Sequence, residues 1–266
     1  MKSKPASVAG LFYPENPDEL MDTMARWLLA EKSVEEYPRA IIVPHSAYQF
    51  SGEIAARAYS SLRHRSDTFR RVILIGSADK YNINGCAIPS HDAFSTPIGD
   101  VSIDRSLIQL ARSHPWIEEN DLVHLMEHSL EVQLPFLQLC LPHFSILPIL
   151  VGNIRSSDLL SVFEYLPLGD DVLYVLSTEL SCSVVDRGTC DVDESAIQSL
   201  IFNQENQHYR STCGTNIMRV FLQFCQQNCW KTELARFGMS HDCESREIPE
   251  NYTTYASFIA HRELPF

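Results

Sequence analysis

Three polar side chains that could bind a metal or move a proton stand directly after apolar runs of the sequence. They are His45 after residues 40–43, Asp79 soon after residues 71–76, and Glu179 after residues 171–178. Continuous apolar runs of this length are typical of strands in a sheet that is covered on both faces. Because the working site of an open α/β sheet lies at the carboxyl ends of its strands, we expect these side chains to converge on one cleft.

Two further places in the chain hold chemically useful side chains. Glu127 and His128 are adjacent, and they fit either an acid–base pair lining the cleft or the cap of the following helix. Cys213 precedes a predicted helix, where the positive end of the helix dipole lowers the pKa of a thiol. The cysteine is therefore either a reactive or metal-binding thiol, or a buried inert one.

The elements that must position these residues alternate between apolar runs and segments with helical periodicity. Strands are predicted at 40–43, 71–76, 145–152, 171–178, 233–239 and 252–261, and helices at 16–28, 53–62, 104–111, 156–166, 193–203 and 215–229. A hairpin is predicted between 86–90 and 99–104, and Pro135 is expected to kink or break a helical segment over 128–140. This order predicts an α/β fold with a mainly parallel central sheet, flanked by helices and carrying some antiparallel strands. Since we find no linker, residues 1–266 are expected to form a single domain.

Composition narrows the class of protein. The 266 residues include 34 acidic and 21 basic side chains, and the net charge of −13 disfavours nucleic acid and anionic membranes as partners. We find no secretory signal and no apolar stretch long enough to span a membrane, so a cytoplasmic protein is expected. The eight cysteines are irregularly spaced, which favours free thiols over a disulfide framework.

Several motifs resemble the Memo family, known in microbes as AmmeMemoRadiSam system protein B. IIVPHSAYQFSG resembles the family's PHAGY.YSG, EHSLEVQLPFL is nearly its signature, and AGLFYP, FSTPIGDVSID, ILPILVG and CGTNIMRVFL follow its pattern in the same order. These matches cover nearly the whole chain. The resemblance implies a LigB-like fold, similar to class III extradiol dioxygenases, with a metal at the strand ends. It also implies His, His and Cys ligands, copper or iron binding, and radical-SAM and AMMECR1-like proteins as partners in trans.

The sequence departs from the family at two of the histidines. His45 and Cys213 match the family's first histidine and its cysteine, but Asp79 stands where the second histidine is expected. A further histidine is missing where Cys182 lies, and Glu179 replaces an aspartate. Carried over in this way, His45, Asp79 and Cys213 make a mixed N/O/S set, with Cys182 as a fourth ligand. Such a set suits zinc or iron(II) better than copper(I). Alternatively, Lys80 pairs with Asp79 and no metal binds.

Three functions follow from this interpretation. The first is a Memo-like protein with an altered metal or redox site, which uses iron, zinc or copper and has no defined reaction. The second is a non-catalytic binding or scaffold protein of the same fold, because loss of two histidines from one cleft is typical of a pseudo-enzyme. The third is a ring-cleaving dioxygenase that uses His45, Asp79 and Glu179.

Overall fold

A central sheet crosses the computed structural model, which describes residues 2–31, 37–179, 213–239 and 254–262. In the described part of the chain this sheet has eight strands. Their spatial order is β10 (Trp230–Met239), β11 (Thr254–Arg262), β2 (Pro38–Val43), β9 (Val172–Ser177), β3 (Arg71–Ser77), β8 (Ser145–Val151), β4 (Cys86–Ile88) and β7 (Ile117–Glu119). The inner strands β2, β9, β3 and β8 are parallel, whereas β11 runs antiparallel to β2, β10 to β11, and β4 to β8.

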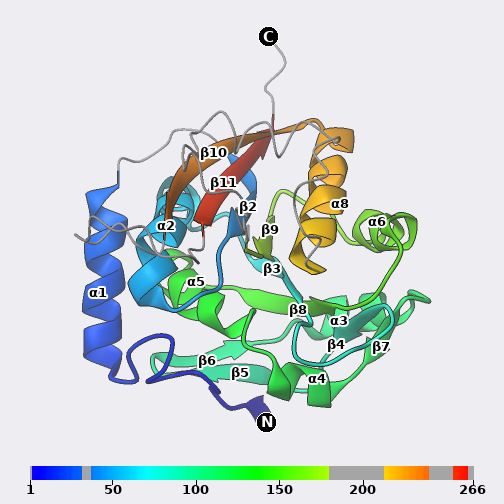
Figure 1. Cartoon of the computed structure of the whole chain (residues 1–266), viewed down its shortest axis with the longest axis horizontal. Helices are drawn as coiled ribbons and strands as arrows, with labels where there is room; N and C mark the ends of the chain where they lie inside the picture. The colour runs from blue at the N-terminus through cyan, green and yellow to red at the C-terminus, as the bar shows by residue number, and fades with distance from the viewer. Residues whose placement is uncertain (1, 32–36, 180–212, 240–253, 263–266) are drawn as a thin grey trace, which may run out of the picture.

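Helices cover both faces of this sheet (Figure 1). The described helices are α1 (Pro17–Ala30), α2 (Tyr48–Ser60), α3 (Arg105–Arg112), α4 (Asp121–Met126), α5 (Leu134–Cys140), α6 (Ser156–Tyr165) and α8 (Cys213–Gln227), with 3-10 turns η1 (Arg63–Arg65) and η2 (Glu131–Gln133). Helices α1, α2 and α5 gather on one side of the inner strands, and α6 and α8 on the other. Strands β2 and β9 are buried along their whole length, which explains their unbroken apolar runs. The predicted α/β class is confirmed.

Capping residues in the sequence account for the starts of two helices. The side chain of Asn16 accepts the N–H groups of Asp18 and Glu19 and so begins α1, with Pro17 in the first turn. Asp104 caps α3 in the same way. The described cysteines with assigned side chains, Cys86, Cys140, Cys225 and Cys229, are free thiols as expected.

Two predictions about local structure need correction. The hairpin forms between β5 (Ala93–Thr96) and β6 (Gly99–Ser102), in a small separate sheet with β1 (Ser3–Lys4), while β4 joins the central sheet. Strand β4 is only three buried residues long, too short for its periodicity to reveal its partner.

The segment over 128–140 is divided at Pro135 as predicted, because the 3-10 turn η2 ends at Gln133 and α5 begins at Leu134. Pro135 lies in the first turn of α5, where its missing N–H has no helical partner to lose. Helix α2 begins five residues earlier than expected, at Tyr48, and therefore contains Gly52. The helix predicted at 193–203 lies outside the described residues.

Candidate functional site

His45 lies directly after β2, at the carboxyl edge of the parallel strands. Its side chain is buried, with 8% of the residue exposed, and its Nδ1 atom has no hydrogen-bond partner among the described residues. The backbone before it is fixed: the N–H of Thr178 donates to the carbonyl of Val43, and the side-chain amide of Gln133 donates to the carbonyl of Pro44 at 2.8 Å. A buried imidazole nitrogen without a partner is costly, so this atom is poised to bind a ligand.

His128 follows α4 and faces His45. The two ring centroids lie 5.8 Å apart at an interplanar angle of 80°, and the ring of Phe12 packs edge-on against His128 with centroids 4.6 Å apart. The Nδ1 atom of His128 is 3.3 Å from Oε1 of Glu127, an ion-pair distance without hydrogen-bond alignment. The structure thus brings together His45, which was predicted to bind a metal, and His128, which was predicted to act with Glu127.

Glu127 is a buried carboxylate whose partners are mainly backbone groups. One oxygen accepts the N–H groups of Asp79 and Lys80 at 2.9 and 3.0 Å, and the other accepts the N–H of His128 at 3.2 Å. Burial alone would raise the pKa of this carboxyl, but the His128 side chain and these N–H groups outweigh burial and lower the pKa. Glu127 therefore holds the turn after β3 against the His128 segment and does not cap the following helix with its carboxylate. Its predicted acid–base role stays a prediction.

Asp79 is exposed, two residues beyond the end of β3. Its Oδ2 atom accepts the hydroxyl of Ser77 at 2.6 Å. Lys80 is also exposed, and within the ranges that the structure describes it forms no ion pair with Asp79. The carboxylate is therefore accessible, but one of its oxygens is already hydrogen-bonded.

Glu179 follows β9 and reaches the His45 segment. The hydroxyl of Ser46 donates to its carboxylate, so a residue adjacent to His45 binds it directly. Thr178, which lies between the end of β9 and Glu179, has a buried hydroxyl that lacks a partner among the described residues. The predicted convergence of the ends of β2 and β9 is visible in this contact.

The two predicted cysteine ligands are not placed relative to the histidines. Cys213 is the first residue of α8, as its position before a helix suggested, but its side chain is not described, and Cys182 lies outside the described residues. Over 2–31, 37–179, 213–239 and 254–262, no group of three or more His, Cys, Asp or Glu side chains is arranged to hold a metal. The His45–Asp79–Cys213 set stays a prediction.

Sequence reasoning missed the polar residue that links the strand ends. The amide of Gln133 donates to both Pro44 and the hydroxyl of Ser177, and its oxygen accepts the hydroxyl of Tyr59. The hydroxyl of Ser177 in turn donates to the carbonyl of Ser129 at 2.6 Å. A glutamine within the apolar run LEVQLPFL was the available signal, since a buried amide must find hydrogen-bond partners.

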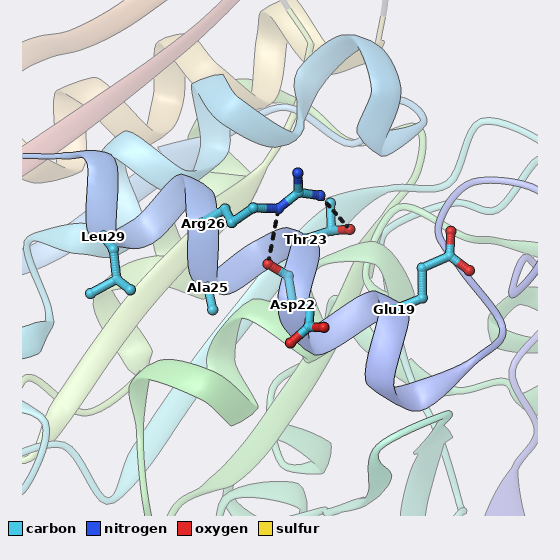
Figure 2. A pocket seen from close by; sticks show the side chains of 6 residues that line it. All are labelled: Glu19, Asp22, Thr23, Ala25, Arg26 and Leu29. Carbon is cyan, nitrogen blue, oxygen red and sulfur yellow. Dashed lines mark hydrogen bonds between the residues drawn. The ribbon is translucent and has the colours of Figure 1, made fainter.

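A surface hollow on α1 is separate from this site. Its lining residues all come from that helix, and Arg26 reaches across it to the carbonyl of Asp22 and the hydroxyl of Thr23 (Figure 2). It includes no residue that the sequence singled out for chemistry.

Comparison with known proteins matches the sequence of this chain to one family. A family model described as Memo-like protein matches residues 4–258. A MEMO1 family protein of Aquifex aeolicus is 32% identical over 79% of each chain, and one of Archaeoglobus fulgidus is 27% identical over 92% of this chain and 95% of its own. The protein memo-1 homolog of Caenorhabditis elegans is 28% identical over 97% of this chain and 81% of its own.

The described helices include none with the length and apolar character needed to cross a bilayer. The motifs around His45, Glu127 and Cys213 thus lie in a chain whose matched region spans nearly its full length. The chain belongs to the Memo-like family.

Proposed function

We propose that this Memo-like protein binds a divalent transition metal at the carboxyl edge of the parallel strands, in a site altered from the family pattern. The observation that supports the proposal is the buried Nδ1 atom of His45, which has no partner among the described residues although the carbonyls of Val43 and Pro44 before it are hydrogen-bonded. An imidazole held in this way loses the hydration that it had in the unfolded chain, and a metal ion replaces that loss with a bond.

The donors predicted from the sequence suit zinc or iron(II). Asp79 presents an accessible carboxylate, and Cys213 stands at the first turn of α8, where the helix dipole favours a thiolate. Cys182 is the fourth candidate ligand. A set of nitrogen and sulfur donors, with or without the oxygen of Asp79, is borderline in softness, which fits these divalent ions. A bound ion would supply Lewis-acid or redox chemistry, and Glu127, His128 and Glu179 are the groups available to hold or move protons.

Metal analysis of the tag-free protein tests the proposal. We expect the wild-type chain to retain zinc or iron through gel filtration, and His45→Ala and Cys213→Ala to lose it. His143→Ala is the matched control, because His143 is exposed and lies outside the site. A wild-type protein that is metal-free, and whose thermal stability does not respond to added zinc, iron(II) or copper, would contradict the proposal.

A non-catalytic binding role is the second candidate. It is favoured by Asp79, whose carboxylate stands exposed and hydrogen-bonded to Ser77 rather than buried beside His45. This role predicts the metal-free outcome just described. A ring-cleaving dioxygenase that uses His45, Asp79 and Glu179 predicts oxygen consumption with catechols, so a catechol panel separates it from both other functions.

A further inference from the structure

The two histidine rings at the strand edge form a pair with an unusual set of partners. Their centroids are 5.8 Å apart and their planes are nearly perpendicular, at 80°. His45 is more than nine-tenths buried, and its Nδ1 atom has no partner among the described residues. Two imidazoles that bind one ion lie at about this separation, because each metal–nitrogen bond is roughly 2.0–2.1 Å long.

The environment of His128 matches that of a metal-binding histidine. Its Nδ1 atom faces the Glu127 carboxylate at 3.3 Å, which leaves the Nε2 atom on the other side of the ring unused by Glu127. Histidines that bind metals through one nitrogen commonly present the other to a carboxylate, which fixes the tautomer and makes the ligand more basic. Glu127 is suited to this role because it is buried and its other oxygen is held by the N–H groups of Asp79 and Lys80.

The position of His128 is built into the surrounding backbone. Glu127 is anchored by the N–H groups of Asp79 and Lys80, and the hydroxyl of Ser129 donates to the carbonyl of Ser77 at 3.1 Å. On its other side, the His128 ring packs against Phe12. The imidazole is therefore held in place before any ligand binds, which lowers the entropic cost of binding.

Asp79 lacks these features. It is exposed, and its carboxylate turns back to the Ser77 hydroxyl in its own strand end. We propose that His128, through Nε2, supplies the second imidazole of the metal site beside His45, and that Asp79 is dispensable for binding. This inference rests on the proposed metal-binding function and names one of its ligands. Two imidazoles favour zinc, iron(II), cobalt(II) and other borderline divalent ions over calcium or magnesium.

Cobalt(II) titration of the full-length, tag-free, metal-stripped protein tests the assignment, with visible absorption and competition against a chromophoric chelator as readouts. We expect His128→Ala and His45→Ala to weaken Co²⁺ binding by about ten-fold or more and to alter the d–d absorption bands, as loss of a ligand does. Asp79→Asn should keep the wild-type affinity and spectrum. Glu127→Gln should weaken binding with the bands retained, because it acts through His128.

Controls separate the possible failures. A thermal unfolding transition like that of the wild type shows that a variant folds. If His128→Ala does not fold, His128→Asn, which keeps much of the ring's volume, replaces it. His143→Ala controls for surface binding. If the wild type binds no Co²⁺, the proposed function itself fails. If the wild type binds Co²⁺ and His45→Ala does not, but the His128 variants bind like the wild type, only the assignment of His128 is overturned.

Discussion

The carboxylate of Glu131 accepts a hydrogen bond of 2.8 Å from the ammonium group of Lys4 and forms an ion pair with it in the protein interior, where both side chains are almost fully buried. The same carboxylate accepts the N–H groups of Ser7 and Val8 and the hydroxyl of Tyr13. Burial alone would raise its pKa, but Lys4 and these donors lower it. One buried carboxylate thus fixes the N-terminal segment that carries Phe12 to the ring of His128.

Glu131→Gln should therefore destabilise the protein strongly. The substitution leaves the Lys4 charge buried without its partner, and we expect a loss of about 3–5 kcal/mol in the free energy of unfolding. Urea denaturation measures this loss. The matched control is Glu119→Gln, which removes an exposed ion pair with Arg112 and should cost about 1 kcal/mol or less. Equal losses of unfolding free energy in the two variants would show that breaking the buried ion pair costs no more than breaking an exposed one.

His124→Gln should make the free energy of unfolding fall less steeply as the pH decreases below about 6.5. Burial lowers the pKa of His124 from 6.5 to about 3, with its Nε2 atom 3.1 Å from the carbonyl of Ala87. Because the folded-state pKa lies below the unfolded one, the stabilising contribution is complete above about pH 6.5 and is lost as the pH falls toward about 3. Within that window the wild type should lose up to about 1.4 kcal/mol per pH unit more than the variant.

Parallel denaturant titrations of the two proteins between pH 7 and pH 4 measure the difference, since the carboxylates common to both cancel. His143→Gln, at an exposed position, should leave the profile of the wild type unchanged. A His124→Gln profile parallel to the wild type would mean that the imidazole titrates normally in the folded protein.

Gly52→Ala should destabilise the protein although alanine favours helices. A Cβ atom at position 52 would lie 2.4 Å from Cζ3 of Trp27, which packs across α2 at that point. The gain in helix propensity is about 1 kcal/mol, whereas overpacking costs about 1–3 kcal/mol. We expect the overpacking to prevail and the melting temperature to fall.

The Trp27→Leu background provides the control for this prediction. With the indole removed, the close contact disappears, and the same Gly52→Ala change should become neutral or stabilising. A double-mutant cycle gives the coupling energy directly. If Gly52→Ala has the same effect in both backgrounds, the contact with Trp27 is not the reason for the glycine.

Gln133→Leu should weaken the edge of the sheet that holds His45. The change preserves approximate volume but leaves the carbonyl of Pro44 and the hydroxyls of Tyr59 and Ser177 without this partner. Buried groups that lose their partner cost about 1–3 kcal/mol each, and equilibrium denaturation should record a loss in this range or above. Gln138→Leu, whose partners lie nearer the surface, is the matched control and should cost less than about 1 kcal/mol. A loss no larger than in the control would contradict a linking role for Gln133.

The fold could be predicted largely because its inner strands are buried on both faces. Apolar runs ending at His45 and near Asp79 and Glu179 identified β2, β3 and β9, and the contact of Ser46 with Glu179 follows from their shared direction. The short strand β4 could not be assigned, because three residues have no distinctive period.

The closeness of His45 and His128 could not be predicted in the same way. It depends on the irregular segment between α4 and η2, which no periodic pattern orients, and on Glu127 binding the turn after β3. Phe12 lies in a loop, and no pattern in the sequence places this loop against an imidazole. Contacts made by irregular segments come from tertiary packing, which local patterns do not encode.

The placement of β2 between β9 and β11 bears on how the chain can be synthesised. Both neighbours of this early strand come from much later in the sequence, and the second, Thr254–Arg262, emerges from the ribosome long after β2. Until then the strand PRAIIV has backbone N–H and C=O groups without partners along one edge, and these groups can pair with strands of other nascent chains. A premature stop before codon 254 should accordingly yield inclusion bodies rather than a shortened working protein.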